Sequence, residues 1–189
     1  MSFYQIYSDQ LYQQLQRIDE QKVDAIVALL VGVWREHKRL FICGNGGSAG
    51  NAQHLANDFS YGINPKGRAI DVEALPANSS VITCLANDTG YDNIFAYQLL
   101  TKARAGDVLL VLSGSGNSRN IINALEQAKE LGVISIALVG YNGGKAKELA
   151  DIVIHNDIND MQIAEDIQVI IGHWLMRQLN EQLENQQHD

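Results

Sequence analysis

The sequence predicts an α/β fold with a parallel sheet covered by helices on both faces. Short apolar runs of strand type alternate along the chain with longer segments of helical periodicity. Two of these runs end in glycine-rich turns that open onto a helix, at residues 44–48 and 113–118. The chain has 189 residues, of which 46% are hydrophobic, enough for the core of a single domain spanning residues 1–189.

Helices are predicted for the N-terminal segment, about residues 1–38. Leu11, Leu15 and Ile18 recur at helical spacing, and a broad apolar stripe then continues as far as Trp34. This segment has the pattern of helices with one face buried against the rest of the molecule.

The α/β core is predicted over about residues 39–158. Strands are expected at residues 39–43, 68–72, 107–112, 133–139 and 151–155. Helices are expected at residues 48–58 and 121–131, and a long C-terminal helix at about residues 160–185. Ligands on open parallel sheets bind at the carboxyl ends of the strands, where the strand order reverses. The two glycine-rich turns follow strands directly, so the functional site is expected there.

The charge balance and the apolar pattern exclude some partners. Lys and Arg number 14 against 22 Asp and Glu, and the net charge of −8 argues against broad binding to nucleic acid or an anionic membrane. The longest apolar stretch, residues 25–34, is about half a membrane span. The first residues lack the pattern of a signal peptide, and Cys43 and Cys84 are expected to be small core residues. A cytoplasmic protein that binds neither nucleic acid nor membranes is expected.

The turn at residues 113–118, Ser-Gly-Ser-Gly-Asn-Ser, favours phosphate binding. Glycine lets the backbone approach a ligand, the amides and the helix dipole favour an anion, and the hydroxyls add donors without charge. The alternative is a serine-rich helix cap with Asn117 or Ser118 at the N-cap. The turn at residues 44–48 is a second site of the same kind, or simply a tight turn that needs positive φ. Together the two turns predict a phosphorylated small molecule as ligand.

Two pairs of polar residues on helices are candidates for chemistry. His54 and Asp58 are four residues apart and share one helix face, which suits two ligands of one metal, a base beside an acid, or only a solvated pair. Glu165 and His173 lie eight residues apart on the last helix, about 12 Å along its axis. A straight helix cannot bring both into one small site, so either the helix is broken near its start or two subunits contribute. A histidine packed within an amphipathic helix is the alternative for His173.

Taken in order, the turn at 44–48, the segment 54–58, the pair 87–88 and the turn at 113–118 resemble the sugar isomerase (SIS) domain family. The resemblance covers nearly the whole chain. It is strongest to the members that interconvert sedoheptulose 7-phosphate and D-glycero-D-manno-heptose 7-phosphate. It implies a flavodoxin-like, three-layer fold with a five-stranded parallel sheet, and a homotetramer whose active sites lie between subunits.

The resemblance also implies roles for individual residues. Substrate binding is expected from Asn45, Gly46, Gly47, Ser48, Asn87, Asp88, Ser113, Gly114, Ser115 and Ser118. Catalysis is expected from Asp58, His173 and Glu165, and one zinc ion per subunit is expected on His54, Asp58, Glu165 and His173. The chain departs from the family at three of its positions. The family's catalytic glutamate is replaced by Asp58, and its glutamine ligand is replaced by Glu165. Its arginine is replaced by Gly62, and Lys66 or Arg68 is expected to supply the missing positive charge.

The leading hypothesis is a ketose–aldose isomerase that acts through a cis-enediol. Asp58 would remove a proton from the carbon beside the carbonyl, with Glu165 as the alternative base if Asp58 is held by metal, and His173 would move protons between the oxygens. Two rival hypotheses are a non-catalytic SIS protein that binds the bacterial replication initiator, and a module that only senses a sugar phosphate. The presence of His173 favours an enzyme.

Overall fold

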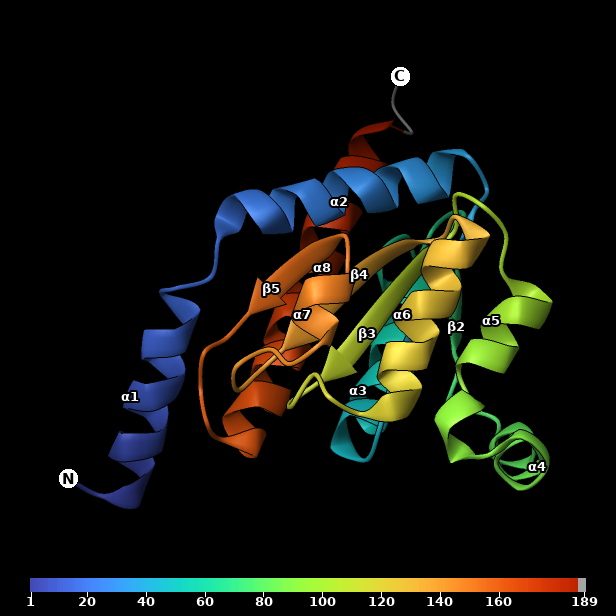
Figure 1. Ribbon diagram of the computed structural model, residues 1–189. Coiled ribbons are helices and arrows are strands. Elements are labelled where there is room, and N and C mark those ends of the chain that lie inside the picture. Colours follow the sequence, from blue (N-terminus) through green and yellow to red (C-terminus); the bar gives the residue numbers. More distant parts are fainter. Residues whose placement is uncertain (187–189) are drawn as a thin grey trace.

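Five parallel strands form a sheet in the order β2-β1-β3-β4-β5 in the computed structural model, which describes residues 1–186 (Figure 1). The strands are β1 (Arg39–Gly44), β2 (Asp71–Ala74), β3 (Val108–Ser113), β4 (Ile134–Val139) and β5 (Ile152–His155). This order is that of flavodoxin-like folds, and it reverses between β1 and β3. The fold class expected from the sequence is confirmed.

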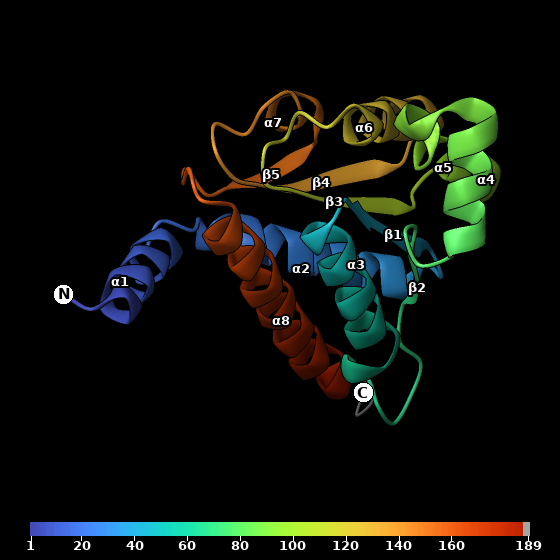
Figure 2. The ribbon, with the colours of Figure 1, turned by 90° about the horizontal axis from the view of Figure 1, so that it is seen from below.

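Helices cover both faces of the sheet and make three layers (Figure 2). One face carries α2 (Glu20–Arg35), α3 (Gly47–Asn57) and α8 (Met161–Gln186). The other carries α4 (Ser79–Thr89), α5 (Ala96–Lys102), α6 (Arg119–Leu131) and α7 (Ala146–Leu149). A π-helical turn, Asp58–Gly62, continues α3, and a 3-10 turn, Tyr91–Asn93, follows α4. Within the described residues, no helix combines the length and the apolar character needed to span a bilayer.

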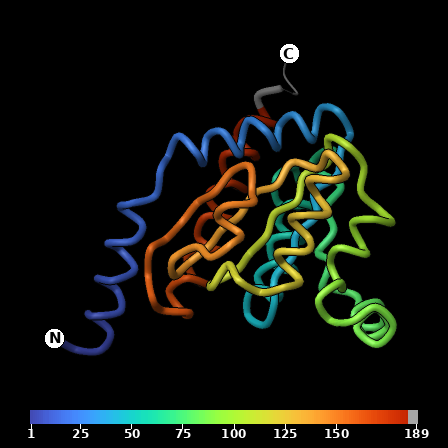
Figure 3. Tube along the Cα trace, in the orientation of Figure 1, coloured from blue at the N-terminus to red at the C-terminus, as the bar shows by residue number. Residues whose placement is uncertain are grey.

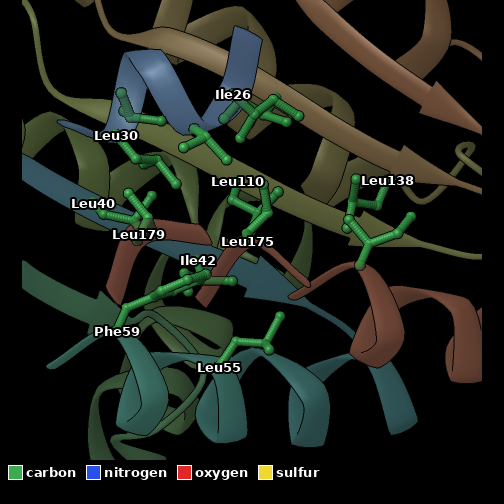
Figure 4. Packing of buried hydrophobic residues seen from close by; sticks show 14 of the residues in the cluster. Ile26, Leu30, Leu40, Ile42, Leu55, Phe59, Leu110, Leu138, Leu175 and Leu179 are labelled. Atoms are coloured by element: carbon green, nitrogen blue, oxygen red, sulfur yellow. The ribbon is translucent and has the colours of Figure 1, made fainter. Parts of the chain in front are cut away.

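Side chains alternate between the two layers along each strand, because successive residues of a strand point to opposite faces. In β1, Leu40 and Ile42 pack toward α2, α3 and α8, among the residues of Figure 4, whereas Phe41 and Cys43 enter the other core. Burial raises the pKa of the Cys43 thiol, as expected for a core cysteine. Cys84 is instead exposed on α4, so its predicted core position is wrong; only Leu85 of that short helix is buried.

Strand β2 begins three residues later than predicted, at Asp71. The reason is that Arg68 is engaged elsewhere: its guanidinium lies 4.4 Å from the Trp34 ring centroid, and its carbonyl accepts the Trp34 indole N–H at 2.7 Å. The parallel ladder with β1 starts where Asp71 pairs with Arg39, and the same two side chains form a salt bridge of 3.0 Å.

The N-terminal helix α1 (Phe3–Leu15) extends from the three layers and packs on α8 (Figures 1 and 2). The Tyr7 hydroxyl donates to the Asp166 carboxylate at 2.6 Å, and this hydrogen bond raises the pKa of Tyr7 to about 12. Much of the rest of α1 is apolar and open to solvent, since Phe3 is 83% exposed and Tyr4 78% exposed.

Helices α3 and α8 lie side by side and run in the same direction (Figure 2). The Asn51 amide donates to the carbonyl oxygen of Glu165 at 3.1 Å and to the Gln168 side chain at 3.0 Å. Further along the pair, Gly172 lies directly against the side chain of Leu55, so that a Cβ at this position would overlap it. The two helices therefore approach closely through a glycine and an amide hydrogen bond.

Replacing Gly172 with valine should separate α3 from α8. Because the added methyl groups would enter the space of the buried Leu55 side chain, we expect the free energy of unfolding to fall by about 1–3 kcal/mol. Chemical denaturation measures this change. The matched control is Gly32→Ala on α2, where a Cβ meets nothing within 4 Å and the better helix former should raise stability by up to about 1 kcal/mol. An unchanged stability of Gly172→Val would contradict the close packing.

Candidate active site

The two glycine-rich turns meet at the point where the strand order reverses. The chain leaves β1 into α3 and β3 into α6 at the same edge of the sheet (Figure 3). The turns enclose a cavity of about 270 Å³, which α8 closes with Met161 and Glu165. Eight of the ten residues expected to bind substrate line this cavity: Asn45, Gly46, Gly47, Ser48, Ser113, Gly114, Ser115 and Ser118.

Among the described residues, none of the three serine hydroxyls of the serine-rich turn, residues 113–118, donates a hydrogen bond within the chain, so their protons are available for a ligand. Ser113 Oγ accepts the Gly116 N–H at 3.0 Å, and Ser115 Oγ accepts the Asn117 N–H at 3.2 Å. Ser118 occupies the N-cap position of α6, but its side chain makes no cap hydrogen bond. A turn that only caps its helix explains why Ser118 stands at the N-cap position. It does not explain why the Ser118 hydroxyl makes no cap hydrogen bond.

Asn45 is held by two residues that the sequence did not suggest. Its side-chain amide and that of the buried Asn120 donate to each other, each at 2.8 Å, and the Tyr91 hydroxyl also donates to Asn45 Oδ1 at 3.0 Å. One Nδ2 hydrogen of Asn45 is left for a ligand. Asn120 looks like an ordinary polar residue in the first turn of a helix, so no sequence signal could have identified it.

Asn87 and Asp88 do not line the cavity. They lie in the last turn of α4, and both are exposed. Their side chains contact each other, with Asn87 Nδ2 donating to Asp88 Oδ1 at 2.7 Å. Asp88 also accepts a hydrogen bond from Cys84, which raises the pKa of that thiol. Of the described residues 87–91, only Tyr91 contacts the turn at residues 44–48, through its hydrogen bond to Asn45.

A second group of polar side chains lies farther along α3 and α8. His54 Nε2 is 2.8 Å from His173 Nε2, and the two nitrogens are 3.5 and 3.4 Å from Asp58 Oδ2. Asp58 begins the π-helical turn that follows α3, so it stays on the same face as His54. The Asp58 side chain is 15% exposed, while the imidazoles are about half exposed and accessible to a ligand. We call His54, Asp58 and His173 the His-Asp-His cluster.

Glu165 is not part of this cluster. Its carboxylate lies against Gly47 and accepts a hydrogen bond from Ser48 Oγ at 3.4 Å. Helix α8 runs unbroken from Met161, so of the two alternatives for Glu165 and His173, a helix broken near its start is wrong. Two helical turns separate Glu165 from His173, and one chain brings together only three of the four expected metal ligands.

The donor atoms of the His-Asp-His cluster suit a divalent metal such as zinc. Two imidazole nitrogens and a carboxylate oxygen lie within 4.8 Å of one another. Zinc accepts these ligand types, and three protein ligands leave the open position that a catalytic site needs. The 3.4 and 3.5 Å separations are close to the spacing of about 3.3 Å between neighbouring ligands of tetrahedral zinc, whereas the two imidazole nitrogens, 2.8 Å apart, would have to move slightly apart to bind the ion. Within one chain, these three residues therefore fit the expected ion, and Glu165 lies outside the set.

The positive charge expected from Lys66 or Arg68 does not reach the site. Arg68 stacks on Trp34 and donates to the Trp34 carbonyl oxygen. Lys66 lines a groove with Met176 and Arg177 and is absent from the lining of the cavity. The prediction for Arg68 is wrong because its guanidinium is already used to hold α2 against the segment before β2.

Comparison with known proteins identifies the class. The family model described as "SIS domain" matches residues 4–140, so the chain belongs to the SIS domain family. Phosphoheptose isomerase from Pelodictyon phaeoclathratiforme is 39% identical over 176 residues, covering 90% of this chain and 82% of that protein. The enzyme of the same name from Mycobacterium tuberculosis is 40% identical over 149 residues, covering 79% and 76%.

A solved structure agrees with these relatives. Phosphoheptose isomerase from Neisseria gonorrhoeae superimposes with a TM-score of 0.87 at 28% identity, covering 94% of this chain and 95% of that one. Within the SIS domain family, the chain therefore belongs with the phosphoheptose isomerases, which are ketose–aldose isomerases.

The His-Asp-His cluster predicts zinc binding that can be measured without turnover. Isothermal titration of the metal-stripped protein with zinc should show one ion per chain, and His54→Ala or His173→Ala should weaken binding at least about 100-fold. Affinity should fall as pH is lowered, since protons compete with zinc for its nitrogen and oxygen ligands.

The control for this measurement is His37→Asn. His37 lies just after the C-cap of α2 with φ of 55°, a conformation that asparagine tolerates, and it lies outside the cluster. Its replacement should leave the zinc affinity unchanged. Equal affinity of wild type and His173→Ala would show that the cluster is not a metal site.

Proposed function

We propose that this enzyme converts sedoheptulose 7-phosphate to D-glycero-D-manno-heptose 7-phosphate. The observation that carries the proposal is the arrangement along α3 and α8: a hydroxyl-lined cavity at one end of the helix pair and the His-Asp-His cluster farther along. The relatives named phosphoheptose isomerase support a seven-carbon sugar phosphate as the substrate. The same arrangement also favours an enzyme over a binding module, since a sensor needs no such cluster.

The phosphate group of the substrate would bind in the turn between β3 and α6. Ser113, Ser115 and Ser118 place hydroxyls there, and α6 directs its N-terminal amides toward the same turn. Helix N-termini stabilise anions through these amides and through the helix dipole. The Asn45 amide would donate to the sugar chain beside the phosphate. None of the described residues that line the cavity is a cation, so neutral donors carry the recognition.

Asp58 and His173 would carry the proton transfers. The Asp58 carboxylate removes a proton from C1 of the ketose, and the C–H electrons form the C1–C2 double bond of a cis-enediol. His173 takes the proton of the C1 hydroxyl and gives one to the C2 oxygen. Asp58 then returns its proton to C2, so no proton or electron is gained or lost. Asp58 is favoured over Glu165 as the base because Asp58 and His173 share one cluster.

Zinc held by His54, Asp58 and His173 would supply a Lewis acid that polarises the carbonyl and hydroxyl oxygens of the substrate. Binding through Asp58 Oδ2 leaves Oδ1 as the atom that accepts the proton. Oδ1 also accepts the Asn57 side-chain amide at 3.3 Å, which helps to orient it. His54 would hold the ion and take no part in the proton transfers, whereas His173, bound through Nε2, would have Nδ1 left to accept and give a proton.

We propose a homotetramer with active sites between subunits as the working form, in the cytoplasm. The support is the separation of the cavity from the cluster by two helical turns, which a neighbouring chain could bridge, and the exposed apolar residues Phe3 and Tyr4 of α1. The mass in solution, measured by light scattering, tests the assembly. The two cysteines are unpaired, which suits a reducing compartment.

Turnover of sedoheptulose 7-phosphate by variants tests the assignment of the cluster. His173→Ala and Asp58→Asn should each lower kcat by about 100- to 10,000-fold, because each removes a proton-transfer group. The affinity for the substrate should change far less, since neither residue lines the cavity. Initial rates and calorimetric binding, measured on variants of unchanged assembly, separate the two effects.

His37→Asn again serves as the control and should retain the wild-type rate. A His173→Ala protein that turns over at the wild-type rate would refute the mechanism. If the wild type isomerises another ketose phosphate but not this one, the mechanism would stand and the substrate would be wrong.

A further inference from the structure

The loop between β4 and α7 packs against the serine-rich turn that is proposed to bind phosphate. We call residues 140–146 the bracing loop. The Gly140 N–H donates to the carbonyl oxygen of Gly114 at 2.9 Å. The Ala146 N–H donates to the carbonyl oxygen of Gly116 at 3.0 Å. The bracing loop contributes none of the residues that line the cavity, so it holds the backbone of the turn and leaves the cavity to the ligand.

These hydrogen bonds set the direction of an amide in the serine-rich turn. In a planar trans peptide, the carbonyl of one residue and the N–H of the next point in opposite directions. Because the Gly114 carbonyl points toward the bracing loop, the Ser115 N–H points away from that loop. Among the described residues, no group accepts a hydrogen bond from this N–H, and Ser115 lines the cavity. The bracing loop thus keeps one backbone donor available for the phosphate.

The bracing loop contains a strained residue that is held by hydrogen bonds on both sides. Tyr141 has φ of 47°, in the left-handed region that residues other than glycine seldom adopt. Its N–H donates to the carbonyl oxygen of Ile158 at 3.0 Å, and its own carbonyl oxygen lies 2.8 Å from His155 Nε2. Such conformations persist where the surrounding structure holds them. The His155 side chain therefore helps to keep the bracing loop in its strained form.

The contacts of His155 define its protonation. Because a carbonyl oxygen can only accept, Nε2 carries the proton that is donated to Tyr141. In the neutral ring Nδ1 is then an acceptor, and Lys147 Nζ lies 3.2 Å from it. Gly143 permits this approach, since a Cβ at that position would overlap the side chain of Lys147. The neutral imidazole with a proton on Nε2 is the form that satisfies both contacts.

We propose that His155 is a positioning residue for the phosphate site, which it supports through the Tyr141 carbonyl and the bracing loop. Without its hydrogen bond, Tyr141 would relax from the left-handed conformation, and the Gly114 peptide would no longer be held in one orientation. His155 lies outside both the cavity and the His-Asp-His cluster, so it affects phosphate binding and not the proton transfers. This inference rests on the proposed function, in which the phosphate occupies the turn between β3 and α6.

Two measurements on the zinc-loaded protein test the proposal. Steady-state kinetics with sedoheptulose 7-phosphate give kcat and KM. Calorimetry gives the dissociation constant of glucitol 6-phosphate, which carries a phosphate but no carbonyl. His155→Ala should raise KM and this dissociation constant by at least about 5-fold, because the phosphate loses an amide donor held in place for it. The kcat should stay within about 3-fold of wild type, since only binding is affected.

His155→Gln is the matched variant, because its side-chain amide offers an N–H in place of the Nε2–H of histidine. It should bring KM and the dissociation constant to within about 2-fold of wild type. The zinc affinity of His155→Ala should equal that of wild type, which shows that α3 and α8 remain in place. His37→Asn, a change at a histidine remote from the bracing loop in sequence, should alter neither constant.

The outcomes separate this proposal from the proposed function. A His155→Ala protein with the wild-type KM and the wild-type affinity for glucitol 6-phosphate would overturn the positioning role. A fall in kcat at unchanged KM, or a His155→Gln protein as impaired as His155→Ala, would overturn it as well. If the wild type binds glucitol 6-phosphate but does not isomerise sedoheptulose 7-phosphate, the proposed reaction is wrong and the binding comparison still decides the role of His155. If the wild type binds neither sugar phosphate, both proposals are wrong.

Discussion

The close parallel packing of α3 on α8 is the contact on which the rest of the site depends. Gly172 lets Leu55 approach α8, and the side-chain amide of Asn51 on α3 donates to the backbone carbonyl of Glu165 on α8. Because both helices run in the same direction, positions along them advance in step: Ser48 meets Glu165, and His54 meets His173. The cavity and the His-Asp-His cluster are thus two levels of one interface, with their separation fixed by the helical rise.

The glycines of the two turns serve the packing of the protein as much as the ligand. Gly47 and Gly114 admit Glu165 and Met161 of α8, which lie one turn apart on the same face of that helix. Gly116 likewise lies against the backbone of Gly143. The chain is acidic, with a net charge of −8, and these close approaches bring backbone amides and hydroxyls to the cavity. These neutral donors take the place of the lysine or arginine that other phosphate sites use.

The sequence predicts the layers and the edge of the sheet that carries the site, because hydrophobic periodicity reports directly on burial. It also predicts that His54 and Asp58 share a face, since that follows from helical spacing alone. Contacts between distant segments were not predictable in this way. Asn120 and Tyr91 contact Asn45 only because separate elements of the chain fold against one another. Glu165 was assigned to one site with His173 only from the family resemblance. Asn87 and Asp88 were likewise assigned to the site by resemblance, and in one described chain they lie outside the cavity.

The central claim is that one face of the α3–α8 pair moves a proton between neighbouring carbons of a bound sugar phosphate. The most direct test is NMR of sedoheptulose 7-phosphate incubated with the zinc-loaded protein in deuterated water. The account predicts aldose product that carries deuterium at C2, since the proton on Asp58 can exchange with solvent before it is returned. Substrate that binds but shows neither aldose nor deuterium incorporation would contradict the account.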